Sequence, residues 1–205
     1  LLLLFVLLVV IYANSFDGKW IFDDTHNIVE NRHVHFKVLD LESIRGSFYG
    51  FQGHKLNRPF SYLSFGFNYY FHGLKEWGYH LVNFIIHCLC ALFVYLFIFN
   101  TLHLPRLEKQ YGDHAGSIAL LAASLWATSP VQVTAVTYIV QRMASMAALF
   151  FIMSMFFYLL GRTSEERYRK ITFFFLCAVC GFLSLASKEN AVMLPLVLFI
   201  FDILL

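Results

Sequence analysis

Six mainly apolar stretches, each without Asp, Glu, Lys or Arg, limit what the chain can fold into more than any other feature. A helix needs about 20 apolar residues to cross a bilayer, where every backbone group must be paired internally. Of the 205 residues, 59% are hydrophobic and 14% are charged, against about 25% charged in soluble domains. The sequence therefore predicts an all-α, polytopic membrane helix bundle. The stretches are Leu1 to Phe16, Leu81 to Leu104, Ser117 to Gln141, Met143 to Gly161, Ile171 to Ser187 and Asn190 to Phe201.

We expect one bundle of about six spans with a substantial first loop. The third stretch contains Pro130, so its helix is predicted to stop near Thr128 and to be followed by a loop or re-entrant piece. Because the chain starts at Leu1 and ends at Leu205 inside apolar runs, we interpret it as the N-terminal part of a larger membrane domain. The predicted division is a first span at 1–16, an outer loop at 17–79, and further spans at 80–104, 117–128, 143–161, 171–187 and 190–205.

Inside the long loop, Pro59 suits the first turn of a helix that is predicted to run from Ser61 to Gly73. Polar residues recur along it every three to four positions, with aromatic residues around them. This pattern is typical of a helix that lies in the membrane interface. Two roles stay open, a membrane-surface anchor and the floor of an active-site cavity. The polar positions are Ser61, Ser64, Asn68 and His72.

The charges of the short loops predict the orientation. The loop from Arg162 to Lys170 carries four basic and two acidic residues, and the loop near Pro105 adds Arg106 and Lys109. Basic short loops face the cytoplasm, so the long first loop and the turns at 129–142 and 187–190 should share the opposite face. The net charge of +2 gives no basic surplus for binding nucleic acid, which we exclude as a partner.

Two adjacent carboxylates, Asp23 and Asp24, follow the first stretch closely. Like charges in a partly desolvated site raise the proton affinity of one of them, which suits a general base or a pair of metal ligands. An exposed Asp-Asp pair is also a common turn or helix cap. The spacing alone does not choose between these interpretations.

Arg142 and Lys188 lie where apolar stretches meet the predicted outer face. A guanidinium there can clamp a phosphate bidentately, or it can extend to lipid headgroups. Lys188 can face the same anion with Glu189 orienting it, or the two can form a self-contained ion pair at a helix junction.

A polar stripe of His80, Asn83 and His87 recurs at helical spacing within the second span. Polar groups at membrane depth point into the bundle, and interhelical hydrogen bonding explains them without a metal, for which further ligands would be needed. The four cysteines lie within apolar stretches and are expected to pack there. We predict no metal site, and no Gly-rich phosphate loop, nucleophile elbow or HExxH motif occurs.

Motifs of the predicted outer face occur in a characteristic order. They are Phe22-Asp23-Asp24 with Asn27 and Asn31, Arg58-Pro59-Phe60 through Asn68-Tyr69, Gly73-Leu74, Trp77 to Asn83 and on to His87, Pro130-Val131-Gln132 to Arg142, and Ser187-Lys188-Glu189-Asn190. With this set the chain resembles the membrane half of the transmembrane and tetratricopeptide-repeat O-mannosyltransferases and their bacterial relatives, which are GT-C glycosyltransferases. The resemblance covers nearly the whole chain.

The resemblance implies an inverting, polyprenyl-phosphate-sugar-dependent enzyme that moves mannose or another hexose to an acceptor hydroxyl, of a protein Ser or Thr, at the outer face. It maps the catalytic base onto Asp23 or Asp24. Arg142, with Lys188, is expected to bind the donor phosphate. Supporting roles are expected for Glu189, His80, Asn83 and Arg58.

One departure from the family pattern concerns Ser129, because relatives commonly carry His before this Pro-Val pair. Full-length relatives also continue with further spans and tetratricopeptide repeats. The sequence from Tyr138 to Met143 looks closest to that of bacterial relatives. We therefore expect the protein to lie in a bacterial inner membrane, or in the endoplasmic reticulum membrane of a eukaryote. The sugar, the acceptor and any need for a divalent cation stay open.

Two other functions compete with the transferase. A transporter or flippase of lipid-linked or small polar solutes would use the His and Asn stripe as its pathway. A non-catalytic membrane anchor would present a repeat domain and would not need the aspartate pair.

Overall fold

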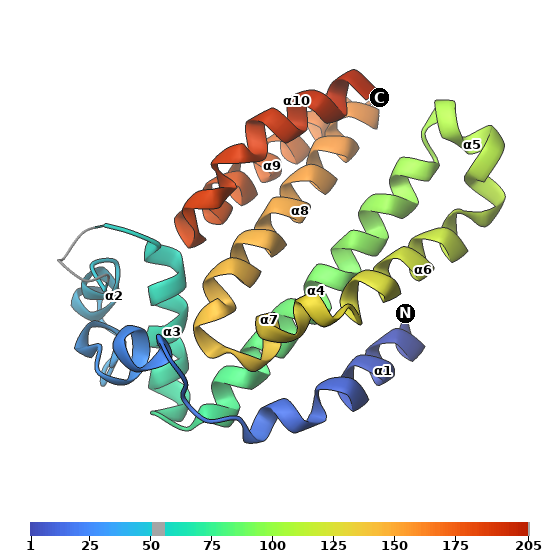
Figure 1. Cartoon of the computed structure of the whole chain (residues 1–205). Helices are drawn as coiled ribbons and strands as arrows, with labels where there is room; N and C mark the ends of the chain where they lie inside the picture. Colours follow the sequence, from blue (N-terminus) through green and yellow to red (C-terminus); the bar gives the residue numbers. More distant parts are fainter. Residues whose placement is uncertain (51–55, 205) are drawn as a thin grey trace.

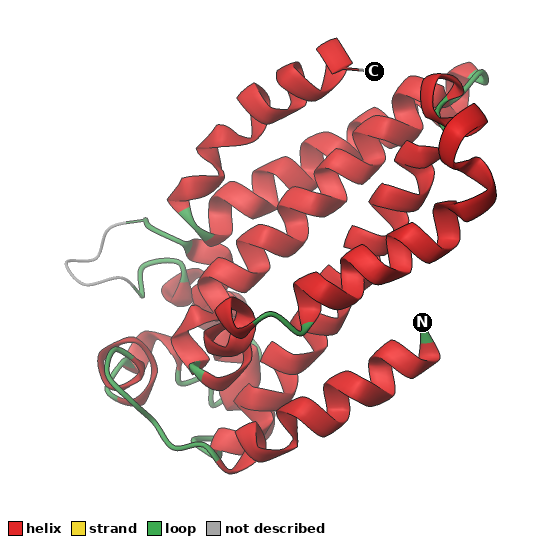
Figure 2. Cartoon of the chain, turned by 45° about the vertical axis from the view of Figure 1, so that its right-hand side comes forward, coloured by secondary structure: helices red, strands yellow, loops and turns green. Residues whose placement is uncertain are grey.

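The structure is a computed structural model that describes residues 1–50 and 56–204, and this part of the chain is helical with no strand (Figures 1 and 2). Residues 51–55 of the predicted outer loop and Leu205 of the last predicted span lie outside the described residues. The α-helices are α1 Leu2–Tyr12, α2 Leu41–Ser47, α3 Pro59–His72, α4 Glu76–Leu102, α5 Pro105–Tyr111, α6 Ala115–Ala127, α7 Val133–Thr137, α8 Arg142–Thr163, α9 Arg167–Ser187 and α10 Leu194–Leu204. Short 3-10 or π turns are η1 Ala13–Asp17, η2 Thr25–Val29, η3 Arg32–Val34, η4 Gly112–His114, η5 Pro130–Gln132, η6 Ile139–Gln141 and η7 Glu189–Met193.

Three helices in the described chain are long and apolar enough to cross a membrane on their own. They are α4, the continuous segment Ile139–Thr163 that contains α8, and α9. A fourth crossing exists if Pro105–Ala127 and Pro130–Thr137, which meet at 54°, form one bent span. The all-α membrane bundle is therefore confirmed, with three to four helices of span length where we predicted about six. The terminal helices α1 and α10 have 11 residues each, so their crossings stay predictions.

The bend in the third span lies where the sequence predicted it. α6 ends at Ala127, and Pro130 opens the short turn η5 before α7. A proline lacks the N–H that would continue the ladder and clashes with the preceding turn, which explains the break. The segment from 129 to 141 is a run of short helical turns rather than an extended loop.

The helix α4 lies at the centre of the bundle, with α6 and α7 on one side and α8 on the other (Figure 1). α8 and α9 form an antiparallel hairpin that is tied by buried serines. Ser154 donates to the Cys177 carbonyl at 2.9 Å, and Ser184 donates to the Ala147 carbonyl at 2.7 Å. Such serine contacts are typical of helix pairs in lipid, where water cannot satisfy a hydroxyl.

The two ends of the bundle carry different sets of loops. At one end, Arg162 donates to Asp202 at 2.6 Å, and α5 lies near the C-terminal turn of α10 (Figure 1). At the other end, α3 packs between α2 and α9, the Val140 N–H donates to Asp24 of the first loop, and Arg58 pairs with Glu189. The three loops that we predicted to share a face therefore do meet at one end. The side of the membrane on which this end lies stays a prediction.

The predicted loop helix is also present. α3 begins at Pro59 and ends at His72, and Gly73 stops it with φ of +58°. The polar stripe faces inward, because Ser61 and Asn68 are buried while Phe67 and Phe71 are exposed. This helix therefore covers the loop end of the bundle with its polar side.

Candidate functional site

The two adjacent aspartates point in opposite directions, and Asp24 is the buried one. Its side chain is 0% exposed, and both carboxylate oxygens accept backbone hydrogen bonds. Oδ1 accepts from the Val140 N–H at 2.7 Å, and Oδ2 accepts from the Ile21 N–H at 3.1 Å. Burial raises the pKa of Asp24, and the two N–H groups oppose that shift. Asp24 therefore fastens the first loop to the segment that precedes α8.

Asp23 faces outward from the same turn. The preceding residue, Phe22, adopts a left-handed backbone conformation with φ of +45°, which is unfavourable for a bulky side chain. This turn leaves Asp23 exposed while its backbone N–H donates to the Tyr138 hydroxyl at 3.1 Å. Asn27 holds the next turn by donating to the Asp23 carbonyl at 2.8 Å. Asp23 thus presents a carboxylate at the loop end, on a backbone that is fixed on both sides.

Arg142 is the largest fully buried side chain in the described structure. Its Nε donates to Asn83 Oδ1 at 2.7 Å, and its Nη2 donates to Asn68 Oδ1 at 2.7 Å and to the Tyr79 carbonyl at 2.9 Å. The guanidinium also lies over the Phe65 ring, 4.8 Å from its centroid. The side chain thus joins α3, α4 and α8. Its predicted contact with a donor phosphate stays a prediction, and in this arrangement the guanidinium is already enclosed by protein groups.

The polar stripe of α4 is hydrogen-bonded to the bent span and to the η6 turn that follows it. His80, Asn83 and His87 are all at most 1% exposed. A bend in a span leaves carbonyl groups without their helical donors, and in lipid these must find other partners. The stripe supplies them, which confirms the interhelical hydrogen bonding that its spacing indicated. The acceptors are the carbonyls of Val136, Ile139 and Ala127, at 3.3, 3.2 and 2.9 Å from His80, Asn83 and His87 respectively.

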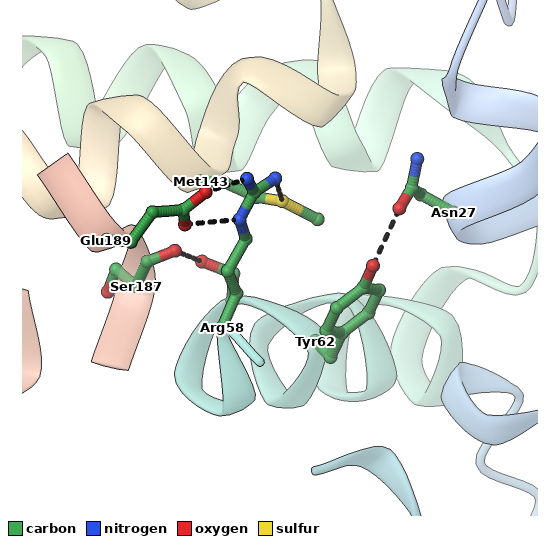
Figure 3. Close-up of polar contacts among 7 residues, drawn as sticks. Asn27, Arg58, Tyr62, Met143, Ser187 and Glu189 are labelled. Carbon is green, nitrogen blue, oxygen red and sulfur yellow. Dashed lines mark hydrogen bonds and ion pairs between the residues drawn. The ribbon is translucent and has the colours of Figure 1, made fainter. Parts of the chain in front are cut away.

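Arg58 and Glu189 form a bidentate ion pair between the start of α3 and η7 (Figure 3). Arg58 Nε donates to Glu189 at 2.8 Å, and its Nη1 lies 3.6 Å from the Met143 sulfur. Close by, the Ser61 hydroxyl donates to the Ser187 carbonyl at 2.9 Å. The hydrogen bond to Arg58 lowers the pKa of Glu189 to about 2. The Arg58–Glu189 ion pair and the Ser61–Ser187 hydrogen bond together hold the α9–η7 junction against α3.

Lys188 lies in this junction, between Ser187 and Glu189. Its side chain is half-buried, and its ammonium makes no hydrogen bond or ion pair with any residue in the described part of the chain. Glu189, which we considered as its partner, binds Arg58 instead, although Lys188 still lies near enough to favour the charged form of Glu189. Lys188 therefore brings an available positive charge to the end of the bundle that carries Asp23.

Two adjoining cavities form a groove between α4, the α6–α7 bend, α8 and η7. Their volumes are about 330 and 310 Å³. The first is mainly apolar and includes Val94, Phe151 and Ile152. The second is more polar. Both share the side chains of Cys90, Trp126, Ala144, Ala148 and Asn190.

Among residues 1–50 and 56–204, no three His, Cys, Asp or Glu side chains are grouped closely enough to hold a metal ion. The four cysteines, Cys88, Cys90, Cys177 and Cys180, are free thiols within α4 and α9.

Proteins with assigned names resemble the chain over most of its length. The human protein named Protein O-mannosyl-transferase TMTC4 is 30% identical over 207 residues, which cover 96% of this chain and 28% of that protein. A Caenorhabditis elegans protein named Protein O-mannosyl-transferase F38B6.6 is 29% identical over 201 residues, covering 94% of this chain and 26% of its own length. Human Protein O-mannosyl-transferase TMTC3 is 29% identical over 146 residues, or 69% of this chain and 15% of that protein. The chain is a relative of the TMTC protein O-mannosyl-transferases.

The resemblance inferred from the ordered motifs is thereby confirmed. This TMTC relative spans less than a third of the length of the proteins it matches. No family model matches the chain, and no solved structure matches it.

Some residues that organise the site of this TMTC relative were not predicted as site residues. Asn68 was noted only as part of an interfacial stripe, but it binds Arg142 directly. Tyr138 holds the backbone of Asp23, and Tyr62 donates to Asn27 at 2.7 Å (Figure 3). Burial raises the pKa of Tyr62 to about 12, so it remains a donor. Their signal was present in the motifs that carried the resemblance, but spacing alone did not connect residues so far apart.

Proposed function

We propose that the chain contributes the catalytic membrane region of a glycosyltransferase that moves a hexose from a polyprenyl-phosphate carrier to a protein hydroxyl at the non-cytoplasmic face. The supporting observation is that an exposed carboxylate and an ammonium without a hydrogen bond in the described residues belong to loops that meet at one end of the bundle. These are Asp23, whose carboxylate interacts with the Tyr138 hydroxyl, and Lys188. The relatives' printed name, protein O-mannosyl-transferase, supports mannose as the hexose and a protein as the acceptor.

Asp23 is the catalytic base in this proposal, and Asp24 positions it. The Asp24 carboxylate already accepts two backbone hydrogen bonds and has no access to an acceptor. The exposed Asp23 carboxylate can take the proton of the acceptor hydroxyl. The acceptor oxygen then forms a bond to the anomeric carbon while the bond from that carbon to the phosphate oxygen breaks. The electron pair of the broken bond stays on the departing polyprenyl phosphate, and attack from the opposite side inverts the anomeric configuration.

The leaving phosphate is already anionic, so it needs charge stabilisation more than a proton. Lys188 supplies this charge in the proposal, because its ammonium is available while Arg58 is paired with Glu189. A positioned cation next to developing negative charge is one of the larger contributions to such catalysis. Arg142 contributes through its buried contacts with Asn68, Asn83 and Tyr79, and it reaches the phosphate only if those contacts rearrange.

The geometry gives less support to the transporter hypothesis. The residues that would line its pathway are buried and hydrogen-bonded to carbonyl groups of the bent span and of the η6 turn. They are His80, Asn83 and His87. The anchor hypothesis predicts that substituting Asp23 and Asp24 leaves the phenotype intact.

The experiment compares three variants of the full-length protein in a transfer assay with polyprenyl-phosphate mannose and a protein acceptor. We expect Asp23→Asn to lower transfer by about 10²-fold or more, since it removes the base. Asp24→Asn should lower transfer together with thermal stability, because it disturbs the buried contact with Val140. Asp17→Asn changes an exposed carboxylate of the same loop and is the control, which should transfer like the wild type.

Wild-type transfer by Asp23→Asn would contradict the assignment of the base. Wild-type transfer by both Asp23→Asn and Asp24→Asn would favour the anchor hypothesis over the enzyme.

A further inference from the structure

The groove beside α8 is polar at one end and apolar at the other. Polar groups in a bundle at membrane depth normally find protein partners. At the polar end, Ser145 donates to the Gln141 carbonyl at 3.1 Å, and His87 lies 2.9 Å from the Ala127 carbonyl. The side-chain carboxamides of Gln132, Gln141 and Asn190 also line the groove, but they make no hydrogen bond within the described residues.

These carboxamides differ from those elsewhere in the bundle. Asn68 and Asn83 are buried and hydrogen-bonded to Arg142. Each carboxamide has two donors and an acceptor, so it can bind a hydroxyl that both donates and accepts. A sugar ring presents such hydroxyls at its edge and C–H groups on its face. Trp126, which also lines the groove, offers an aromatic surface for that face.

Small side chains of α8 leave space at the apolar end of the groove. Ala147 and Ala148 follow Ala144 by three and four residues on α8, and all three line the first cavity. Val94, Phe151 and Ile152 line it as well. Small residues usually let two membrane helices approach closely. Here they line a space instead, which suits a hydrocarbon chain entering from the bilayer.

Asn190 is at the junction of the two compartments, since it lines both. It lies in the turn that follows Lys188, and this turn is held against α3 by the Arg58–Glu189 and Ser61–Ser187 contacts (Figure 3). In a lipid-linked sugar the phosphate lies between the sugar and the chain. Lys188 precedes Asn190 by two residues, so a cation belongs to the same turn as a residue that lines both compartments.

We infer that this groove is the binding site for the sugar donor, with the hexose beside Gln132 and Gln141 in the second cavity and the first part of the hydrocarbon chain beside Val94, Ala147 and Ile152 in the first. The inference rests on the proposed function for the identity of the donor. The combined cavities also fit it in size, since each lies within the roughly 300–1,000 Å³ of ordinary ligand pockets. A bilayer lipid could use the apolar end but would leave the three carboxamides without partners.

The test measures binding of two probes to the full-length protein in detergent, polyprenyl-phosphate mannose and the same polyprenyl phosphate without a sugar. Ala148→Trp fills the groove and should weaken binding of both probes by about tenfold or more. The paired change Gln132→Leu with Gln141→Leu should weaken the mannose-bearing probe by about tenfold and leave the sugar-free probe unchanged. Ala178→Trp, on the exposed side of α9, is the control and should bind both probes normally.

Unchanged binding of both probes by Ala148→Trp would overturn the inference. Equal effects of the glutamine changes on both probes, or none on either, would overturn the placement of the hexose at Gln132 and Gln141. Melting temperatures of all variants show whether a loss of binding reflects unfolding. Asp23→Asn separates this inference from the proposed function, because it should bind both probes normally while losing transfer. If Asp23→Asn transferred mannose normally, Asp23 would not be the base. The binding results would still show whether the groove binds the donor.

Discussion

Polar side chains on the two sides of the α4–α8 pair differ in their hydrogen bonding. On the side of α3, Arg142 donates to both Asn68 and Asn83, and no buried side-chain N or O atom is left unpaired in the described structure. On the side of α6 and α7, the carboxamides of Gln141 and Asn190 face a cavity and have no partner in the described chain. Paired polar groups in lipid stabilise a fold, whereas unpaired ones at a cavity are free to bind a ligand.

The largest effect is expected from removing the centre of the paired side. Arg142→Met keeps most of the side-chain volume but leaves Asn68, Asn83 and the Tyr79 carbonyl without their donor. Each buried acceptor that loses its donor costs about 1–3 kcal/mol, so we expect a large fall in the melting temperature of the purified protein. Arg167→Met changes an exposed arginine at the opposite end, so it is the control and should melt like the wild type. A wild-type melting curve for Arg142→Met would show that the network is not what holds α3 to the bundle.

Arg142 also shows what the sequence could and could not predict. Its position at the end of an apolar stretch indicated either a phosphate or lipid headgroups, and both readings assume an accessible guanidinium. Its partners Asn83 and Asn68 are 59 and 74 residues away, so no local pattern connects them. In contrast, the helix start at Pro59 and the stop near Thr128 follow from proline geometry, which acts within a few residues, and both were predicted.

The aspartate pair gives the same lesson at shorter range. The sequence identified the pair but not which carboxylate is buried, because that depends on the left-handed turn at Phe22 and on the distant Val140. The inward stripe of α4 was correctly interpreted as interhelical bonding, since helical spacing puts His80, Asn83 and His87 on one face. Periodicity thus predicted the face, and the tertiary structure decided the partners.

A smaller effect is expected from the ion pair that joins α3 to the turn at the groove. Glu189 has its pKa lowered to about 2 by Arg58, so the pair adds stability above the ordinary carboxyl pKa of 4.5 and loses it as the pH falls toward 2. Because the Glu189 side chain is 61% exposed, its replacement by Gln should cost less than about 1 kcal/mol at neutral pH. The check is the difference in melting temperature between wild type and Glu189→Gln, which should shrink at acidic pH. A difference that is independent of pH would mean that the pair does not contribute through its charge.

The smallest effect on stability, and the sharpest test of the comparison, is expected at Gln141. Its carboxamide lines the groove and has no partner in the described residues, so Gln141→Leu should change the unfolding free energy by less than about 0.5 kcal/mol. Asn83→Leu, one helix away, removes hydrogen bonds to Arg142 and to the Ile139 carbonyl and should cost about 1–3 kcal/mol. Melting curves of the two variants in the same detergent measure the contrast. Equal losses of unfolding free energy would mean that Gln141 is hydrogen-bonded within the fold like Asn83. Its carboxamide would then not be free to bind a ligand.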